Sequence, residues 1–130
     1  MKALALDYGR ARTGVAVSDP TGTVVRPFGV VERAGSERGL DRIAEIVGEV
    51  QPDLVVVGLP LTLRGDEGAQ AEETRRFVDL LTERLQVPID LFDERFTTRL
   101  AEQHAGDAPP DARAAAHLLA TYLTWSRSGS

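Results

Sequence analysis

The sequence contains no cysteine, which excludes disulfide bonds and thiolate metal sites. It also has no apolar run that approaches the roughly 18–20 residues needed to cross a bilayer. The short apolar stretch at the N-terminus reaches a charge at Asp7, too early for a signal peptide. From these absences we expect a cytoplasmic protein with no membrane partner.

Lysine is almost missing as well. Lys2 is the only lysine, so 14 of the 15 basic residues are arginines, set against 20 acidic residues and a formal net charge of −5. Nucleic-acid-binding proteins normally carry a basic footprint, and this balance argues against a simple version of that function. Arginine contacts phosphate in a bidentate manner better than lysine does, so the placement of the arginines matters more than the total.

The remaining composition is that of a globular protein. With 130 residues, 42% apolar and 27% charged, the chain has the size of one domain with a single core. We expect this domain to cover residues 1–126, followed by a frayed tail at 127–130.

Three strands are predicted in the first quarter of the chain, at residues 2–7, 13–19 and 23–32. Their connections are too short for crossovers, so they should form an antiparallel meander. Pro27 and Gly29 indicate that the third strand is an edge strand or contains a bulge.

From residue 36 onward, helical periodicity alternates with short apolar runs. The predicted elements are a helix capped by Ser36 and ended by Pro52, a strand at 53–59, a helix over 74–85, a strand at 89–93, a short helix from Thr97 or Thr98 to about Gly106, and a last helix at 111–125. The intervening helices place the last two strands parallel to the first. The sequence therefore predicts an α/β fold with a mixed five-stranded sheet and helices on both faces.

Acidic residues stand at the ends of these elements. Asp7 closes the first strand, Asp93 and Glu94 close the fifth, and Asp111 opens the last helix. Because the first and fifth strands are predicted to be parallel, their acids should emerge at the same carboxyl-terminal edge, where α/β sheets bind ligands.

The periodicity of the last helix predicts where its acidic residue points. The positions that share the apolar stripe expected to face the sheet are Asp111, Ala115, Leu118, Tyr122 and Trp125. Asp111 should therefore point inward, towards the other carboxylates.

Three carboxylates gathered without a cation would repel one another. Two unit charges about 4 Å apart cost roughly 1 kcal/mol in water and about 4 kcal/mol at an intermediate dielectric. Mg2+ or Mn2+ relieves this repulsion, and a pair of such ions can drive phosphodiester hydrolysis. Each acid also has a plain structural interpretation: Asp111 as a helix cap, Asp7 as a turn residue, and Glu94 as a surface ion pair. Only their coincidence at one edge favours a site.

Four segments resemble the YqgF/RuvX family, in the same order and at fitting intervals. They read LDYGRARTGVAVSDP, VGLPLTLRGDEG, DERFTT and DARAAAHLLATYL, and the similarity runs from residue 4 to about 123. The resemblance implies an RNase H-like fold and a nuclease that acts late at the 5′ end of pre-16S rRNA. A Holliday junction resolvase, by kinship with RuvC, is the alternative.

The same resemblance implies a divalent metal site, for Mg2+ or Mn2+, formed by Asp7, Glu94 and Asp111, which would be the catalytic residues. Asp93 ranks second, since it should point to the opposite side of its strand from Glu94.

The chain departs from the family just before the last helix. Members often carry basic residues there, whereas this chain reads GDAPP at 106–110. Other arginines are predicted near the acidic edge and are the expected nucleic-acid-binding residues: Arg10, Arg12, Arg64, Arg95 and Arg99.

Two other functions compete with the nuclease. The Asp7-Tyr8-Gly9 turn followed by Gly14 resembles the first phosphate-binding turn of actin-like and sugar-kinase ATPases, although those proteins use two such domains. A non-catalytic nucleic-acid-binding module is the second alternative, but binding alone would not require a repulsive cluster of acids. The sequence leaves open both RNA against DNA junction as substrate and monomer against homodimer.

Overall fold

The computed structural model describes residues 1–96 and 108–129. In these ranges the elements follow one another as β1 (Ala3–Asp7), β2 (Arg12–Ser18), β3 (Val25–Glu32), α1 (Glu37–Val50), β4 (Leu54–Leu59), α2 (Ala69–Thr82), β5 (Ile89–Asp93), the 3-10 turn η1 (Glu94–Phe96) and α3 (Pro110–Gly129). The short helix expected between Thr97 and Gly106 lies outside the described residues. No helix in these ranges is long and apolar enough to span a membrane.

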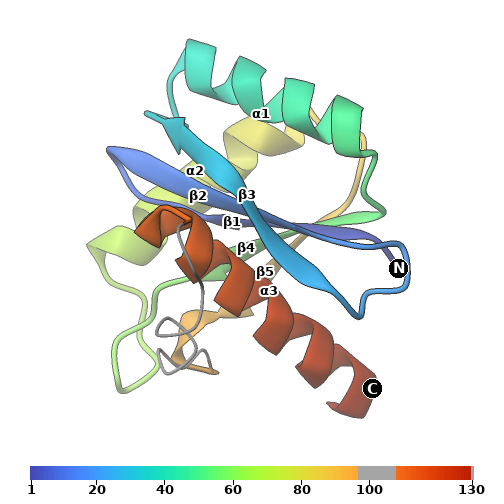
Figure 1. Cartoon of the computed structure of the whole chain (residues 1–130). Helices are drawn as coiled ribbons and strands as arrows, with labels where there is room; N and C mark the ends of the chain where they lie inside the picture. Colours follow the sequence, from blue (N-terminus) through green and yellow to red (C-terminus); the bar gives the residue numbers. More distant parts are fainter. Residues whose placement is uncertain (97–107, 130) are drawn as a thin grey trace.

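The described strands form one five-stranded sheet in the order β3-β2-β1-β4-β5 (Figure 1). β2 runs antiparallel to β1 and β3, whereas β4 runs parallel to β1 and β5. The predicted mixed sheet is thereby confirmed. β3 lies at an edge, and its register shifts where Val15 pairs with Gly29 and Ala16 with Pro27, which leaves Phe28 as the extra residue of a bulge.

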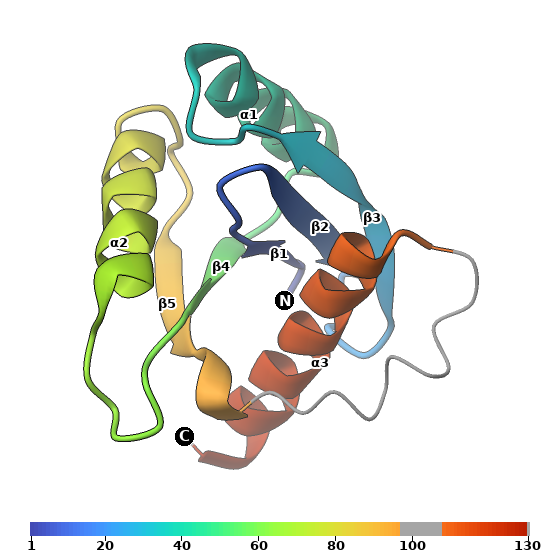
Figure 2. The same ribbon diagram turned by 90° about the vertical axis from the view of Figure 1, so that its left-hand side faces the viewer.

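Helices cover both faces of the sheet, with α1 and α2 on one side and α3 on the other (Figures 1 and 2). Side chains alternate along β1: Leu4 and Leu6 pack in the core beneath α1 and α2, while Ala3 and Ala5 pack against α3. The alternation continues to Asp7, which therefore lies on the α3 face at the carboxyl-terminal end of the strand.

The ends of the helices differ from the sequence prediction in three places. Ser36 caps α1 as expected, accepting the Gly39 N–H at 3.1 Å. α2, however, begins at Ala69, before the expected start at Thr74, and ends at Thr82, before Leu85. α3 continues to Gly129, past the expected end at Trp125 and through most of the segment expected to be a tail. Serine and glycine weaken a helix without stopping it, so composition is a poor guide to where α3 ends.

The predicted stripe of α3 is mostly buried. Ala115, Leu118 and Tyr122 are at most 6% exposed and pack on the sheet, but Trp125 is 49% exposed. Tyr122 and Trp125 both contact the ring of Phe92 on β5. The predicted rotation of α3 about its axis is therefore confirmed along its central turns.

Candidate active site

Asp7 lies between two glycines on the α3 face of the sheet. It pairs with Gly14 on β2. On its other side, the parallel register pairs Leu6 with Val57, so Gly58 is the next residue of β4 alongside Asp7. Neither neighbour carries a side chain, which leaves space on both sides of Asp7 for groups from elsewhere in the chain.

Glu94 occupies the space above Gly58. A Cβ atom at Gly58 would lie 2.5 Å from Glu94 Oε1 and 2.7 Å from Glu94 Cγ. Glu94 follows directly after β5. Its side chain therefore lies across β4 in the direction of β1. Asp7 and Glu94 line the same cleft, of about 500 Å3, at the carboxyl-terminal edge of β1. Figure 2 looks onto this edge, with α2, α1 and the start of α3 around the β1–β2 turn.

The start of α3 occupies the space above Gly14. A Cβ atom there would lie 1.8 Å from the Asp111 carbonyl oxygen, so no larger residue fits while α3 keeps its position. The Asp111 side chain pairs with Arg12, with 3.2 Å between Oδ2 and Nε, and 37% of it is exposed. In the part of the chain that the structure describes, no three acidic or histidine side chains are placed to hold a metal ion together.

The structure thus brings two of the three predicted acids into one cleft. It places the backbone of the third, Asp111, at the same edge, where the Asp111 carboxylate forms an ion pair with Arg12. Unlike Glu94, Asp93 is not among the described residues that line the cleft, as expected from the alternation of side chains along the strand. It accepts hydrogen bonds from the Arg95 guanidinium and, with a smaller effect, from the Arg95 backbone N–H, which lower the pKa of Asp93.

The predicted nucleic-acid-binding arginines have different surroundings. Arg10 lines the cleft and pairs with Glu73, and Arg12 pairs with Asp111. Arg64 is exposed in the loop between β4 and α2. Arg95 pairs with Asp93 at 2.7 Å, and Arg99 lies outside the described residues.

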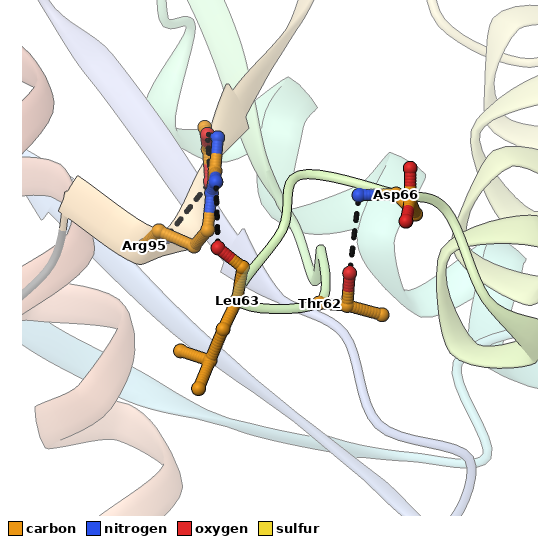
Figure 3. A network of polar contacts seen from close by, with 5 residues as sticks. Thr62, Leu63, Asp66 and Arg95 are labelled. Atoms are coloured by element: carbon orange, nitrogen blue, oxygen red, sulfur yellow. Dashed lines mark hydrogen bonds and ion pairs between the residues drawn. The ribbon is translucent and has the colours of Figure 1, made fainter.

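Arg95 also supports the loop that carries Arg64. Its Nη1 donates to the Leu63 carbonyl at 3.4 Å (Figure 3). The loop is a short hairpin: Leu61 and Glu67 form a bridge, and the Gly65 N–H donates to the Thr62 carbonyl at 2.8 Å. Leu63 lies at its tip with 96% of its surface exposed.

Glu73 on α2 is a cleft residue that the sequence pattern did not indicate. It accepts hydrogen bonds from the Tyr8 hydroxyl at 3.2 Å and from Arg10 Nη2 at 2.6 Å. The hydrogen bond from Arg10 lowers the pKa of Glu73, whereas burial and the Glu73 charge raise the pKa of Tyr8. The one local signal is that Glu73 precedes the buried Phe77 by one helical turn, and Phe77 stacks on Tyr8 with 4.4 Å between ring centroids.

Asp7, Glu94 and Asp111 all belong to the sequence segments that resemble the YqgF/RuvX family. A comparison with family models gives the same family. A model of the RuvX family, described as a Holliday junction resolvase, matches residues 1–124. A protein of Chloroflexus aurantiacus named "Putative pre-16S rRNA nuclease" is 41% identical over 134 residues, which cover 96% of this chain and 88% of the relative. The chain belongs to the RuvX family.

A second relative of the same name, from Syntrophomonas wolfei, is 35% identical to this RuvX-family chain, covering 95% of the chain and 94% of the relative. Among solved structures, RuvC of T. thermophilus in complex with a Holliday junction substrate superposes with a TM-score of 0.67. That match is 20% identical and covers 100% of this chain and 97% of RuvC. It shows that the RuvX-family chain has the RNase H-like fold that the family resemblance implied, and the strand order agrees with it.

Proposed function

We propose that this chain is a metal-dependent endonuclease that hydrolyses phosphodiester bonds in structured nucleic acid, with the 5′ end of pre-16S rRNA as its cytoplasmic substrate. One observation carries the proposal: Asp7 ends β1, Glu94 directly follows the parallel strand β5, and both line one cleft, with Glu94 covering Gly58 of the strand between them. Membership of the RuvX family and the names of the relatives supply the substrate class.

The donor chemistry of the cleft fits a hard divalent cation, which prefers carboxylate oxygens. Asp7, Glu94 and Asp111 would hold Mg2+ or Mn2+, which when bound supplies activation of a water molecule and stabilisation of the leaving oxygen. In the structure the Asp111 carboxylate pairs with Arg12, and we expect metal binding to draw it away from that arginine. The guanidinium of Arg12, 67% exposed already, then becomes available to a substrate phosphate.

Asp7→Asn tests the proposal, since it removes the central carboxylate charge and keeps the shape of the side chain. The purified protein is incubated with a labelled RNA that spans the 5′ end of pre-16S rRNA and with four-way DNA junctions, in Mg2+, Mn2+ or EDTA. Glu83→Gln is the matched control, because Glu83 is an exposed acid at the opposite end of α2. We expect metal-dependent RNA cleavage in the parent and in Glu83→Gln, and a loss of at least about 100-fold in Asp7→Asn, the scale seen when a charge-stabilising catalytic group is removed.

Holliday junction resolution is the second candidate, favoured by the description of the matching family model. A resolvase must place two sites on one junction, which requires a two-fold homodimer, whereas a monomer suffices for trimming RNA. Cleavage of the DNA junction but not the RNA, together with a dimer in light scattering, would replace rRNA processing by this function. Tight binding of either substrate without cleavage in either metal would contradict catalysis and indicate the non-catalytic module.

A further inference from the structure

A second cavity, of about 430 Å3, adjoins the carboxylate cleft and shares Tyr8, Arg10 and Glu73 with it. We call it the arginine pocket, because three arginines line it: Arg10, Arg33 and Arg76. They come from the β1–β2 turn, from the segment before α1, and from α2. Among the described residues that line it, Glu73 is the only acid, which gives them a formal excess of two positive charges in a chain whose net charge is −5.

Two of these arginines differ from six others among the described residues. Arg10, Arg12, Arg42, Arg75, Arg84 and Arg95 all form ion pairs. Within residues 1–96 and 108–129, Arg33 and Arg76 form none. The charge of Arg76 contributes to lowering the pKa of Glu73, after the larger effect of the hydrogen bond from Arg10. Glu73 accepts hydrogen bonds from Arg10 and Tyr8 and forms no ion pair with Arg33 or Arg76, so the excess positive charge has no acidic partner among the described lining residues.

The backbone holds Arg33 in an unfavourable conformation at this place. Its φ of 47° lies in the left-handed region, which non-glycine residues seldom adopt. Its N–H donates to the Ala11 carbonyl at 2.9 Å, and its carbonyl accepts the Ser36 N–H at 2.9 Å. The first bond ties the segment before α1 to the β1–β2 turn that follows Asp7, and the second lies within that segment. Strain of this kind is concentrated at functional sites.

The other wall of the pocket is apolar. Tyr8 and Phe77 stack with an interplanar angle of 25°, and Leu80 beside them is 40% exposed. A basic rim against an aromatic and aliphatic wall suits a nucleotide unit, whose phosphate binds arginine and whose sugar and base contact apolar surface.

We propose that the arginine pocket binds a backbone phosphate of the substrate strand, next to the phosphate that is cut, through Arg33 and Arg76. Glu73 positions Arg10 and Tyr8 as the partition between this pocket and the carboxylate cleft. The proposal rests on the nuclease function proposed above, and it places the substrate strand across the β1–β2 turn, between α1 and α2. This path also supplies basic contacts that the chain lacks before Asp111, at 106–110.

The test compares Arg33→Ala/Arg76→Ala with Arg26→Ala/Arg42→Ala. Both variants remove two exposed positive charges, but Arg26 and Arg42 lie outside both cavities. Binding of fluorescein-labelled pre-16S RNA and of a labelled DNA junction is measured by fluorescence anisotropy in EDTA. The salt concentration is varied from about 50 to 300 mM, roughly the range in which counterion release changes the affinity. Circular dichroism and urea unfolding check that each variant is folded.

Losing one phosphate contact lowers the salt slope by about 0.7–0.9, which weakens binding about five- to eightfold at about 0.1 M salt. We expect this loss in Arg33→Ala/Arg76→Ala, little change in the control pair, and partial recovery in Arg33→Lys/Arg76→Lys. Equal slopes and affinities in the two alanine pairs would overturn the pocket and leave the nuclease standing. Absence of binding by the parent protein in EDTA, together with absence of cleavage in Mg2+ and Mn2+, would overturn both.

A free nucleotide offers the same phosphate chemistry as a strand, and a further arm separates the two. Thermal unfolding of the parent and of Arg33→Ala/Arg76→Ala is followed with ATP, GTP and inorganic phosphate. If these ligands raise the Tm of the parent alone, while RNA and junction bind both proteins equally, the pocket holds a mononucleotide and the strand assignment is wrong.

Discussion

At the scale of single residues, Gly58 controls where Glu94 can lie. It sits on β4 between the strands that carry the two acids, and Glu94 Cδ is 3.0 Å from the position that a Cβ atom would take. A methyl group here would displace the carboxylate without changing its charge. Gly58 therefore allows a test of position that substitution of Glu94 itself cannot provide.

We predict that Gly58→Ala folds but loses divalent metal affinity by about 10–100-fold, the usual effect of disturbing the support of a ligand. The clashing atoms belong to a flexible side chain at the surface, so the free energy of unfolding should change little. Isothermal titration with Mn2+ measures the affinity. Gly29→Ala on β3 is the control, since nothing lies within 4 Å of its Cβ position. Unchanged Mn2+ affinity in Gly58→Ala would argue against Glu94 as a ligand.

At the scale of elements, the hairpin between β4 and α2 is held by its own turn and by β5. Thr62 Oγ1 accepts the Asp66 N–H at 3.1 Å (Figure 3). Gly65 has a φ of 90°, and its open face lies against the Arg95 guanidinium. Arg95 is fixed in turn by Asp93, so the strand that delivers Glu94 also braces the loop at the cleft rim.

Gly65→Ala should lower the free energy of unfolding by about 1–2 kcal/mol, because an L-residue is strained in the left-handed region. Gly48→Ala should have the opposite sign and raise it by about 0.5–1 kcal/mol, since Gly48 lies inside α1 with nothing within 4 Å of its Cβ position. Urea denaturation of both variants measures the difference. An equal gain in both would mean that the Gly65 turn is not strained.

At the scale of the whole molecule, Tyr122 joins α3 to the far side of the sheet. Its hydroxyl donates to Asp90 Oδ2 at 2.8 Å, and its ring packs edge-on against Phe92. Burial, followed by the hydrogen bond to Asp90, raises the pKa of Tyr122 to about 12. In the unfolded chain a tyrosine titrates near about 10, so folding and proton binding are coupled at alkaline pH.

The sign of this coupling is fixed by the raised pKa. Between about pH 10 and pH 12 the folded protein keeps the Tyr122 proton that the unfolded chain has lost, so stability falls as the pH rises through this window. We predict that Tyr122→Phe has a shallower decline in the free energy of unfolding above about pH 10. Urea denaturation across this range provides the measurement. Tyr8→Phe, which removes the other tyrosine, should retain the part that Tyr122 contributes; identical declines in the parent and in Tyr122→Phe would contradict the coupling.

Much of the sheet topology and side-chain orientation was predictable because both depend on the hydrophobic pattern and the connection lengths of neighbouring elements. Short connections required an antiparallel meander, and the strand–helix alternation placed β4 and β5 parallel to β1. Strand alternation distinguished Glu94 from Asp93, and helical periodicity oriented Ala115, Leu118 and Tyr122. Each of these inferences needs only the period of one element, which the sequence carries directly.

Contacts between distant elements were decided by the tertiary structure alone. The pairing of Arg12 with Asp111 and the junction of Tyr8, Arg10 and Glu73 depend on strand register and on how each helix is rotated and placed over the sheet. The same holds for Arg33 and Arg76, which are far apart in sequence and line one cavity. The sequence by itself determined the layers, the sheet edge and the acids that stand there, since hydrophobic periodicity acts within each element. Which arginines remain unpaired, and which cavity they share, was set by packing between elements, to which no local pattern responds.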